Sequence, residues 1–252
     1  MIDNKTMAFI NAYAVFGAFE NLCDLDDEAK KLASPEKPIS IRFNVSDGPQ
    51  AVYSFGNGKC VMTKGASAAD IHLKLFSCDA LNKMVQGKAT PIPLKGLFKI
   101  GFVTGNFTKI GEILEKYLRA KPEQLAERKF FEASTKLMCN VIAGAICQIA
   151  NHDPIGKISA SRIPDGIIGF EIGDDVALSI FCKGGKLDLD KSRCDNPRSI
   201  MKFKDIDTAR AMFDGKEDAM ACIGNGTLTL KGYIPMLMNM NNILGRVAMY
   251  LA

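Results

Sequence analysis

The spacing of apolar residues changes from a helical period to a strand period, and this change occurs twice along the chain. Each half opens with an apolar helical run, Met7–Phe19 in the first and Leu137–Ala150 in the second. Short runs that alternate or are rich in β-branched residues follow each helix. The predicted strands are 39–45, 51–55, 59–63, 70–76 and 97–103 in the first half, and 155–163, 167–172, 177–183, 199–203 and 227–233 in the second.

Turn residues separate the predicted strands and the two halves. Asn57-Gly58 predicts a tight hairpin, and the glycine pair within Cys182–Asp188 predicts another. The stretch Leu118–Glu127 combines a proline with mixed charges, which is typical of a linker. We therefore expect two domains, residues 1–120 and 121–252.

A short helix is predicted late in each half, between an acidic start and a glycine stop. In the first half it follows Asp79 and ends at Gly87. In the second half it follows Asp205 or Asp207 and ends at Gly215. Both helices precede the last predicted strand of their half.

An apolar helix closes each half, at 107–118 and at 235–250, and each shows one continuous apolar face. The simplest interpretation is that these faces pack on their own sheets. The second helix is rich in methionine, and the chain has twelve methionines and no tryptophan. Because methionine adapts to variable shapes, the alternative is that these helices line a site for an apolar ligand.

Four pairs of segments resemble each other in the same order in the two halves, which predicts an internal repeat. The matches are Ala14–Leu22 with Val141–Ile149, Ser46–Phe55 with Pro164–Ile172, Ser77–Ala89 with Asp205–Glu217, and Leu97–Leu118 with Gly226–Leu251. In this alignment the second half carries about ten extra residues between its Asp-Gly turn and Gly215.

Composition excludes some classes of function. The net charge of +4 is spread evenly, with 15 basic and 12 acidic residues in 1–120, so nucleic acid is not an expected partner. The apolar run at 137–150 is too short to span a bilayer, so no transmembrane segment is expected, although transient membrane contact is compatible with the sequence. The eight cysteines form no C-x-x-C pair, and without a secretory signal they predict reduced, buried thiols in the cytoplasm.

The motifs SCDALNKMVQGKATP, LKGLFKIGFVTGNFTKIGEIL and DIDTARAMFDGKEDAM, in this order of elements, resemble the sterol carrier protein type two family. The resemblance covers about residues 38–118 and 155–251. It implies an α+β fold in each half, a twisted, mainly antiparallel sheet of about five strands with helices on one side. It also implies an apolar cavity between sheet and C-terminal helix that takes a fatty acid, acyl-CoA or sterol. Tandem pairing departs from the family's usual single module.

The expected function is therefore non-catalytic binding or carriage of a lipid, with no cofactor and no metal. Lys88, Lys95 or Lys216 could meet a carboxylate or phosphate of the ligand. The residues expected to line the cavities are Met84, Val85, Phe98, Ile100, Phe102, Phe107, Ile110, Leu114 and Tyr117 in the first half, and Met212, Phe213, Leu228, Leu230, Tyr233, Met236, Leu237, Met240 and Leu244 in the second.

Two alternatives remain open from the sequence. The first is an accessory module that docks on a partner enzyme and has no open cavity. The second is an enzyme that uses the same cavity, with His72 and Asp70 as acid and base because residues two apart on a strand share a face. The acidic clusters lack the spacing of a calcium loop, and the glycine-rich pieces fit neither a dinucleotide fingerprint nor a phosphate-binding loop.

Overall fold

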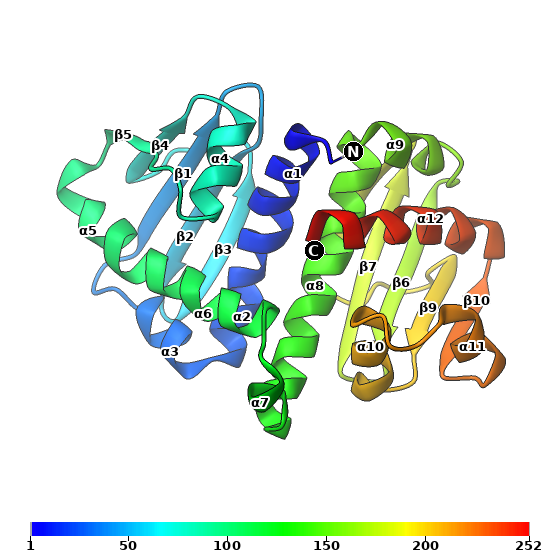
Figure 1. Cartoon of the computed structure of the whole chain (residues 1–252). Coiled ribbons are helices and arrows are strands. Elements are labelled where there is room, and N and C mark those ends of the chain that lie inside the picture. Colours follow the sequence, from blue (N-terminus) through cyan, green and yellow to red (C-terminus); the bar gives the residue numbers. More distant parts are fainter. Residues whose placement is uncertain (1, 252) are drawn as a thin grey trace. The chain divides into compact units, whose positions relative to one another are not determined.

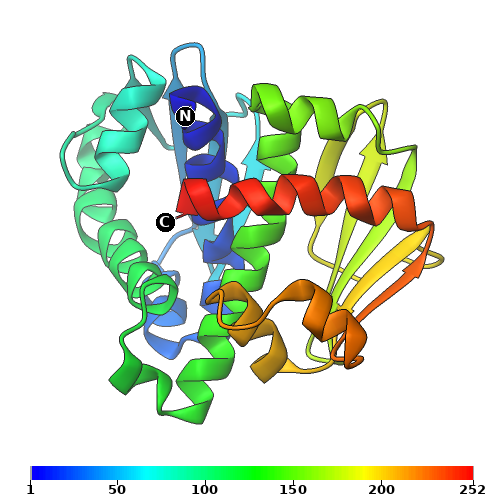
Figure 2. The same ribbon diagram turned by 45° about the vertical axis from the view of Figure 1, so that its right-hand side comes forward.

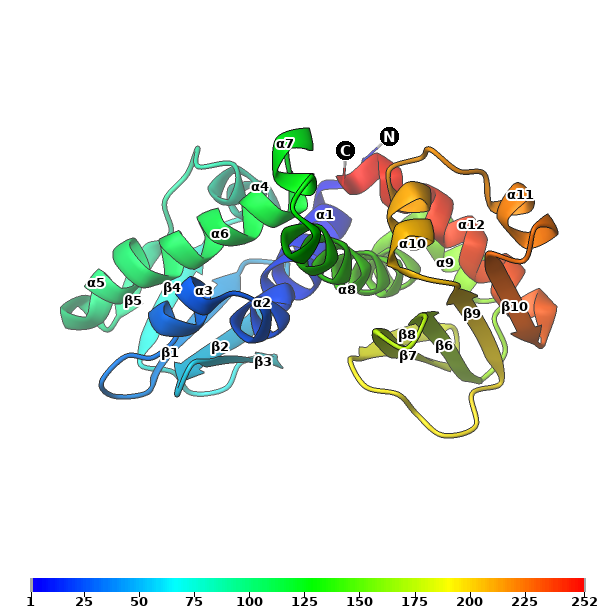
Figure 3. The same ribbon diagram turned by 90° about the horizontal axis from the view of Figure 1, so that it is seen from below.

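The computed structural model describes residues 2–251 and divides into two compact units, residues 1–121 and 122–252. Each unit contains one five-stranded sheet packed with helices (Figure 1). Seen from below, the helices of each unit lie on one side of its own sheet (Figure 3). The predicted α+β class with two similar domains is confirmed.

The first sheet has the strand order β3-β2-β1-β4-β5. Its central pair, β1 and β4, is parallel, and the other neighbours are antiparallel. Buried and partly exposed residues alternate along β1 and β4, so one face of the sheet meets the core. The strands are β1 (Ile39–Val45), β2 (Gln50–Gly56), β3 (Lys59–Lys64), β4 (Ile71–Leu75) and β5 (Ile92–Lys95).

The second sheet repeats this arrangement, with the order β8-β7-β6-β9-β10. Its parallel pair is β6 and β9. By position in the sheet, β6 to β10 thus correspond to β1 to β5. The strands are β6 (Gly166–Ile172), β7 (Val176–Lys183), β8 (Lys186–Asp190), β9 (Ser199–Phe203) and β10 (Leu228–Gly232).

The helical part of the first unit contains two π-helical turns, η1 and η4, each followed by further helix. The π-helical turn is rare and appears mostly inside longer helices. The helical segments are α1 (Asn4–Ile10), η1 (Asn11–Val15), η2 (Phe16–Ala18), α2 (Phe19–Leu25), α3 (Asp27–Leu32), α4 (Cys78–Val85), η3 (Leu97–Lys99), α5 (Ile100–Phe102), η4 (Val103–Phe107) and α6 (Thr108–Leu118).

The long helix α8 is the centre of the second unit and contacts β7, β8, α9, α10 and α12. By length and composition it could cross a membrane, but 89% of its most apolar stretch is buried inside the protein, as in a core helix. Figure 2 shows α12 running across the helical layer of this unit. The helices are α7 (Pro122–Leu125), α8 (Arg128–His152), α9 (Pro154–Ala160), α10 (Ile206–Phe213), α11 (Ala219–Gly224) and α12 (Ile234–Leu251).

The predicted turns and caps are largely found. Asn57 and Gly58 join β2 to β3 with φ of 52° and 73°, the left-handed pair that a type I′ hairpin needs. Asp205 caps α10 by accepting a hydrogen bond from the Thr208 N–H. In the first unit the cap is Ser77 rather than Asp79, which lies in the first turn of α4.

Two predicted strands are wrong. The stretch 155–160 belongs to α9, because Asp153 caps the N–H groups of Ile155 and Gly156 and Pro154 occupies the first helical position. The stretch 97–103 is helical, since Ile100 and Val103 continue the apolar spacing of the helix that follows. The fifth strand lies earlier, at β5, where Pro93 is tolerated because β5 is an edge strand.

The predicted repeat alignment is out of step by one strand in its second match. Asp47 and Gly48 precede β2, whereas Gly166 begins β6, which corresponds to β1. When β6 is aligned with β1, the spans to Gly87 and Gly215 become nearly equal, so the ten extra residues disappear. The matched short helices, by contrast, occupy the same place in both units and both end at a glycine with positive φ.

Candidate ligand-binding groove

An apolar groove of about 300 Å³ opens on the first unit. It lies between the loop that enters β1 and the helical turns that follow β5. Its volume is at the lower end of the range of small-molecule sites, so it suits part of an alkyl chain rather than a whole lipid. The lining residues are Pro35, Lys37, Pro38, Ile39, Phe98, Lys99, Gly101 and Phe102.

Gly96, which follows β5, allows the backbone turn that forms one side of this groove. Gly96 has φ of 84°, and an added Cβ would lie 2.5 Å from the Asp70 carbonyl oxygen. Only glycine fits this position, where the chain leaves the sheet and enters η3 and α5. Phe102 at the end of α5 is then fixed against Phe55, with ring centroids 5.3 Å apart.

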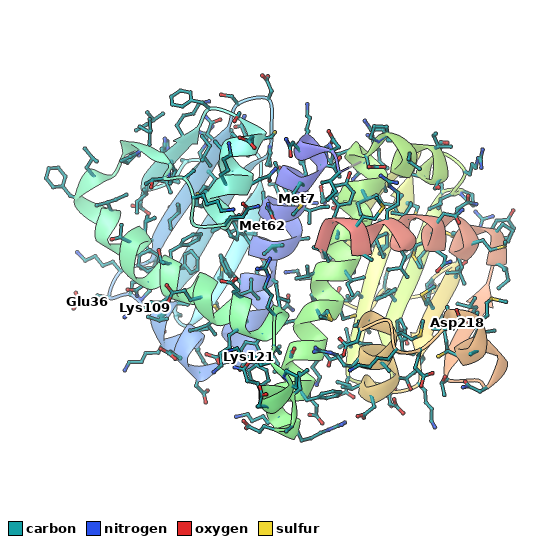
Figure 4. All side chains as sticks on the ribbon, viewed as in Figure 1. Met7, Glu36, Met62, Lys109, Lys121 and Asp218 are labelled. Atoms are coloured by element: carbon teal, nitrogen blue, oxygen red, sulfur yellow. The ribbon has the colours of Figure 1, made fainter. Side chains whose placement is uncertain are left out.

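Prolines fix the opposite side. Pro35 and Pro38 restrict the backbone of the loop between α3 and β1. Pro38 also packs on Gly56, where an added Cβ would come within 3.3 Å of the proline ring. Glu36, labelled in Figure 4, marks this loop and is exposed. Both sides of the groove are therefore set by restricted backbone.

Two lysines, Lys37 and Lys99, stand among the apolar lining residues. The Lys99 ammonium group pairs with Asp70 over 2.5 Å, and Asp70 also accepts hydrogen bonds from the Ser40 N–H and hydroxyl. The hydrogen bond from Lys99 is the main cause of a lowered Asp70 pKa, with Ser40 contributing and burial opposing it. Asp70 therefore stays ionised and holds Lys99 at the groove.

The interior of the first unit, by contrast, is occupied by its own aromatic rings. Phe107 lies at the centre, with its ring centroid 5.4 Å from Phe19, 5.6 Å from Phe43 and 5.7 Å from Phe16. Tyr53 lies 6.5 Å from Phe107 and is fully buried. These rings fill space between the sheet and the helices, which the resemblance had assigned to a ligand.

The predicted cavity residues of the first half accordingly separate into two sets. Phe98 and Phe102 line the surface groove, and Ile100 lies between them in the sequence but is not part of the lining. The α6 residues and Phe107 are buried, and the Tyr117 hydroxyl donates to Asp26 over 2.9 Å. Met84 is half-buried and Val85 exposed on α4. The buried set comprises Phe107, Ile110, Leu114 and Tyr117.

In the second unit, the predicted residues range from the core to the surface. Phe213 is half-buried and packs edge-on against Phe203 at 5.4 Å. Tyr233 is exposed, and the Arg198 guanidinium lies 4.9 Å from its ring centroid. The fully buried members are Leu228, Met236, Leu237 and Met240, and the half-buried ones are Met212, Leu230 and Leu244.

In the possible acid–base pair of His72 and Asp70, other side chains act on both members. Asp70 is engaged by Lys99 and Ser40. Burial lowers the pKa of His72, and the charges of Arg42 and Lys95 lower it further. Within residues 2–251, no group of three or more histidine, cysteine or acidic side chains is placed to hold a metal ion.

Of the residues that line the groove, the sequence analysis named only Phe98 and Phe102. Pro35, Pro38 and Ile39 belong to a loop and a strand start that show no chemical motif. Gly101 was assigned to a strand, which hid its place on a helical turn. The available signal was the pair of prolines spaced three apart before the first strand, which marks a rigid entry to the sheet.

Comparison with known proteins gives matches to solved structures only. No family model matches the sequence, and no curated protein matches it significantly. The ubiquinone synthesis protein UbiJ-SCP2 is 16% identical, with 43% of this chain and 94% of that chain covered and a TM-score of 0.35. Domain 2 of the sterol carrier protein of Helicoverpa armigera is 16% identical, covers 51% and 93%, and has a TM-score of 0.36. Sterol carrier protein 2 of Yarrowia lipolytica is 19% identical, covers 42% and 88%, and has a TM-score of 0.32.

Proposed function

We propose that this protein binds an apolar, lipid-like ligand without transforming it, and that the groove of the first unit takes part of the ligand's alkyl chain. The observation behind this proposal is the groove, which has a volume of about 300 Å³ and a mainly apolar lining that includes two lysines. Such a site suits an amphiphile whose chain lies on Phe102 and Pro38 and whose acidic group meets Lys37 or Lys99. A fatty acid or an acyl ester of a phosphate has this chemistry.

The packed aromatic interior of the first unit favours binding in the surface groove rather than in an internal cavity. Opening a ligand cavity beneath α6 would require the displacement of Phe107 from five neighbouring rings. Loss of a buried phenylalanine from its site costs about 3–5 kcal/mol. A ligand that enters at Phe102 avoids this cost.

A steric block tests the proposal. Gly101 lines the groove, and an added Cβ there meets no atom within 4 Å, so Gly101→Phe should add a ring beside the groove without a clash. Gly111→Phe on α6 is a matched control, because Gly111 has equally open space but does not line the groove. We expect a fluorescent fatty acid to bind the wild-type chain and Gly111→Phe alike and to bind Gly101→Phe at least tenfold more weakly. Equal binding by all three proteins would contradict the proposal.

Native mass spectrometry gives an independent measurement on the same proteins. A lipid that copurifies with the full chain should add its mass to the wild-type protein and to Gly111→Phe, and should be lost from Gly101→Phe. Retention of the lipid by Gly101→Phe would place the ligand elsewhere in the chain.

A further inference from the structure

The outer face of the first sheet, opposite the helices, carries basic side chains across three strands. Arg42 of β1 pairs with His72 of β4, and His72 pairs with Lys95 of β5. Arg42 and His72 alternate with buried neighbours along their strands, so they point away from the core. Arg42, His72 and Lys95 form the basic row, and Lys74 lies on the same face of β4.

The hydrogen-bond partners of Arg42 and Lys95 are neutral groups. The Arg42 guanidinium donates to the neutral Gln50 side chain over 3.1 Å, and the Lys95 ammonium donates to the Ala69 carbonyl over 3.0 Å. Within residues 2–251, Nε of Arg42 is buried and has no hydrogen-bond partner. Asp70, which directly precedes β4, pairs with Lys99. These neutral partners leave the charges of Arg42 and Lys95 in place, whereas the lowered pKa of His72 leaves its ring largely uncharged at neutral pH.

Large apolar side chains follow the basic row along the free edge of the sheet. We call Ile92, Leu94, Leu97 and Phe98 the apolar edge. Their exposed fractions are 49%, 63%, 61% and, for Phe98, complete exposure. Between Asp79 and Glu112 the chain contains five lysines and no carboxylate. Clusters of exposed apolar residues mark interaction sites, and this one lies in a wholly cationic stretch.

The second unit shows that the fold does not require this surface. At the three positions of the basic row it has Gly169, Ile200 and Lys231. Its outer face also carries an acidic residue, Glu171, within 3.4 Å of Arg193 and 3.8 Å of Lys202. Glu171 thus offsets part of the positive charge on this face of the second unit.

A loop also covers the outer face of the second sheet. The Ser179 hydroxyl donates to the Ser192 carbonyl and accepts from the Cys194 N–H, over 2.8 and 2.9 Å. Ser179 is buried as a result. The corresponding connection in the first unit, 65–70, has only glycine, alanine and serine before its aspartate. Lys95 remains exposed, and Arg42, His72 and Lys74 partly so.

We propose that this surface docks on an anionic membrane, with the basic row and Lys74 against lipid phosphates and the apolar edge in the acyl boundary. Charge complementarity selects the anionic surface, and the adjoining apolar edge selects a lipid bilayer over a soluble anion. Interfacial binding elsewhere combines the same two contributions. This docking surface shares Phe98 with the groove, so Lys74 and Lys95, which do not line the groove, test the docking separately from the ligand proposed for it.

Vesicle sedimentation of the full chain tests the docking surface. We expect binding to vesicles of phosphatidylcholine with phosphatidylglycerol and little binding to phosphatidylcholine alone. Each cation near an anionic bilayer contributes about a fivefold gain in partitioning, so Lys74→Gln with Lys95→Gln should weaken binding by more than tenfold. Leu97→Ser with Phe98→Ser should weaken it further. The matched control, Lys231→Gln with Met238→Ser, removes an equally exposed cation and apolar side chain from the second unit and should change nothing.

Three results would overturn the proposal. One is equal sedimentation with neutral and anionic vesicles. Another is unchanged binding by the Lys74 and Lys95 double variant, with its unfolding midpoint checked to exclude misfolding. The third is a pair of observations: inorganic phosphate shifts the His72 ring resonances, and the protein does not sediment with anionic vesicles. Together they would identify a site for a soluble anion instead of a membrane.

Discussion

The Tyr250 hydroxyl donates a hydrogen bond of 2.6 Å to Oδ2 of Asp153, so the end of α12 is tied to the start of α9. Arg246 donates to the same oxygen over 2.8 Å. The other carboxylate oxygen, Oδ1, caps α9 through the N–H groups of Ile155 and Gly156. Asp153 is 1% exposed. One buried carboxylate therefore joins a helix cap to the closing helix of the second unit.

Asp153→Asn should destabilise the second unit by about 3 kcal/mol, because Arg246 would lose its charged partner inside the protein. Urea unfolding of the full chain at neutral pH measures this loss. Asp218→Asn is a matched control: Asp218 also caps a helix through Oδ1, but it is exposed. Because asparagine and aspartate cap about equally well, the control should lose less than about 1 kcal/mol. Equal losses would show that the ion pair contributes nothing beyond the cap.

The same carboxylate predicts acid sensitivity. Burial alone would raise the pKa of Asp153, but hydrogen bonds from Arg246, Tyr250 and the Gly156 N–H outweigh burial and lower it. Its contribution to stability is therefore complete above the unfolded-state pKa, near 4, and is lost as pH falls through the lower folded-state pKa. The stability difference between wild type and Asp153→Asn should shrink below about pH 4. A difference that stays constant across an acid titration would contradict this assignment.

Phe107 and Phe98 are close in sequence and opposite in environment. Phe107 is buried among aromatic rings, and Phe98 is fully exposed. Phe107→Ala should cost about 3–5 kcal/mol, and Phe98→Ala should stay within about 0.5 kcal/mol of wild type. Chemical unfolding of the full chain compares the two variants directly. If Phe107→Ala were as mild as Phe98→Ala, the aromatic interior would not be a packed core.

His72 reports the charge of the basic row. Since Lys95 contributes to its lowered pKa, Lys95→Met should raise that pKa toward the ordinary histidine value. NMR titration of the ring protons measures the change. Lys88→Met removes an exposed lysine that does not lower the His72 pKa, and it should leave the titration unchanged. A similar shift in both variants would indicate a general loss of charge rather than a local effect.

Most strands and turns of this fold could be predicted because they depend on local patterns. Alternation along Ile39–Val45 and Ile71–Leu75 reflects one buried face, and Asn57-Gly58 is a local hairpin signal. The edge strand β5 could not be predicted in the same way. Its Pro93 argues against a strand unless the strand is known to lie at an edge, and that knowledge comes only from the sheet.

The groove was only partly predictable, for a similar reason. Phe98 and Phe102 attracted attention as apolar residues, but whether such a residue lies in a core or a groove depends on its partners in space. Phe107 illustrates this, because the resemblance placed it in a cavity lining, whereas Phe16, Phe19 and Phe43 surround it. The contacts that decide between these outcomes join residues far apart in the sequence.

The affinity for fatty acids of increasing chain length tests the central claim most directly. Calorimetric titration of the full chain would give Kd for a homologous series. If the alkyl chain lies in the groove, each added methylene should lower Kd about fourfold, at about 0.8 kcal/mol, until the groove is full and Kd levels off. The plateau should come at a short chain, since the groove holds about 300 Å³. A Kd that does not depend on chain length, or a complete lack of binding, would contradict the account.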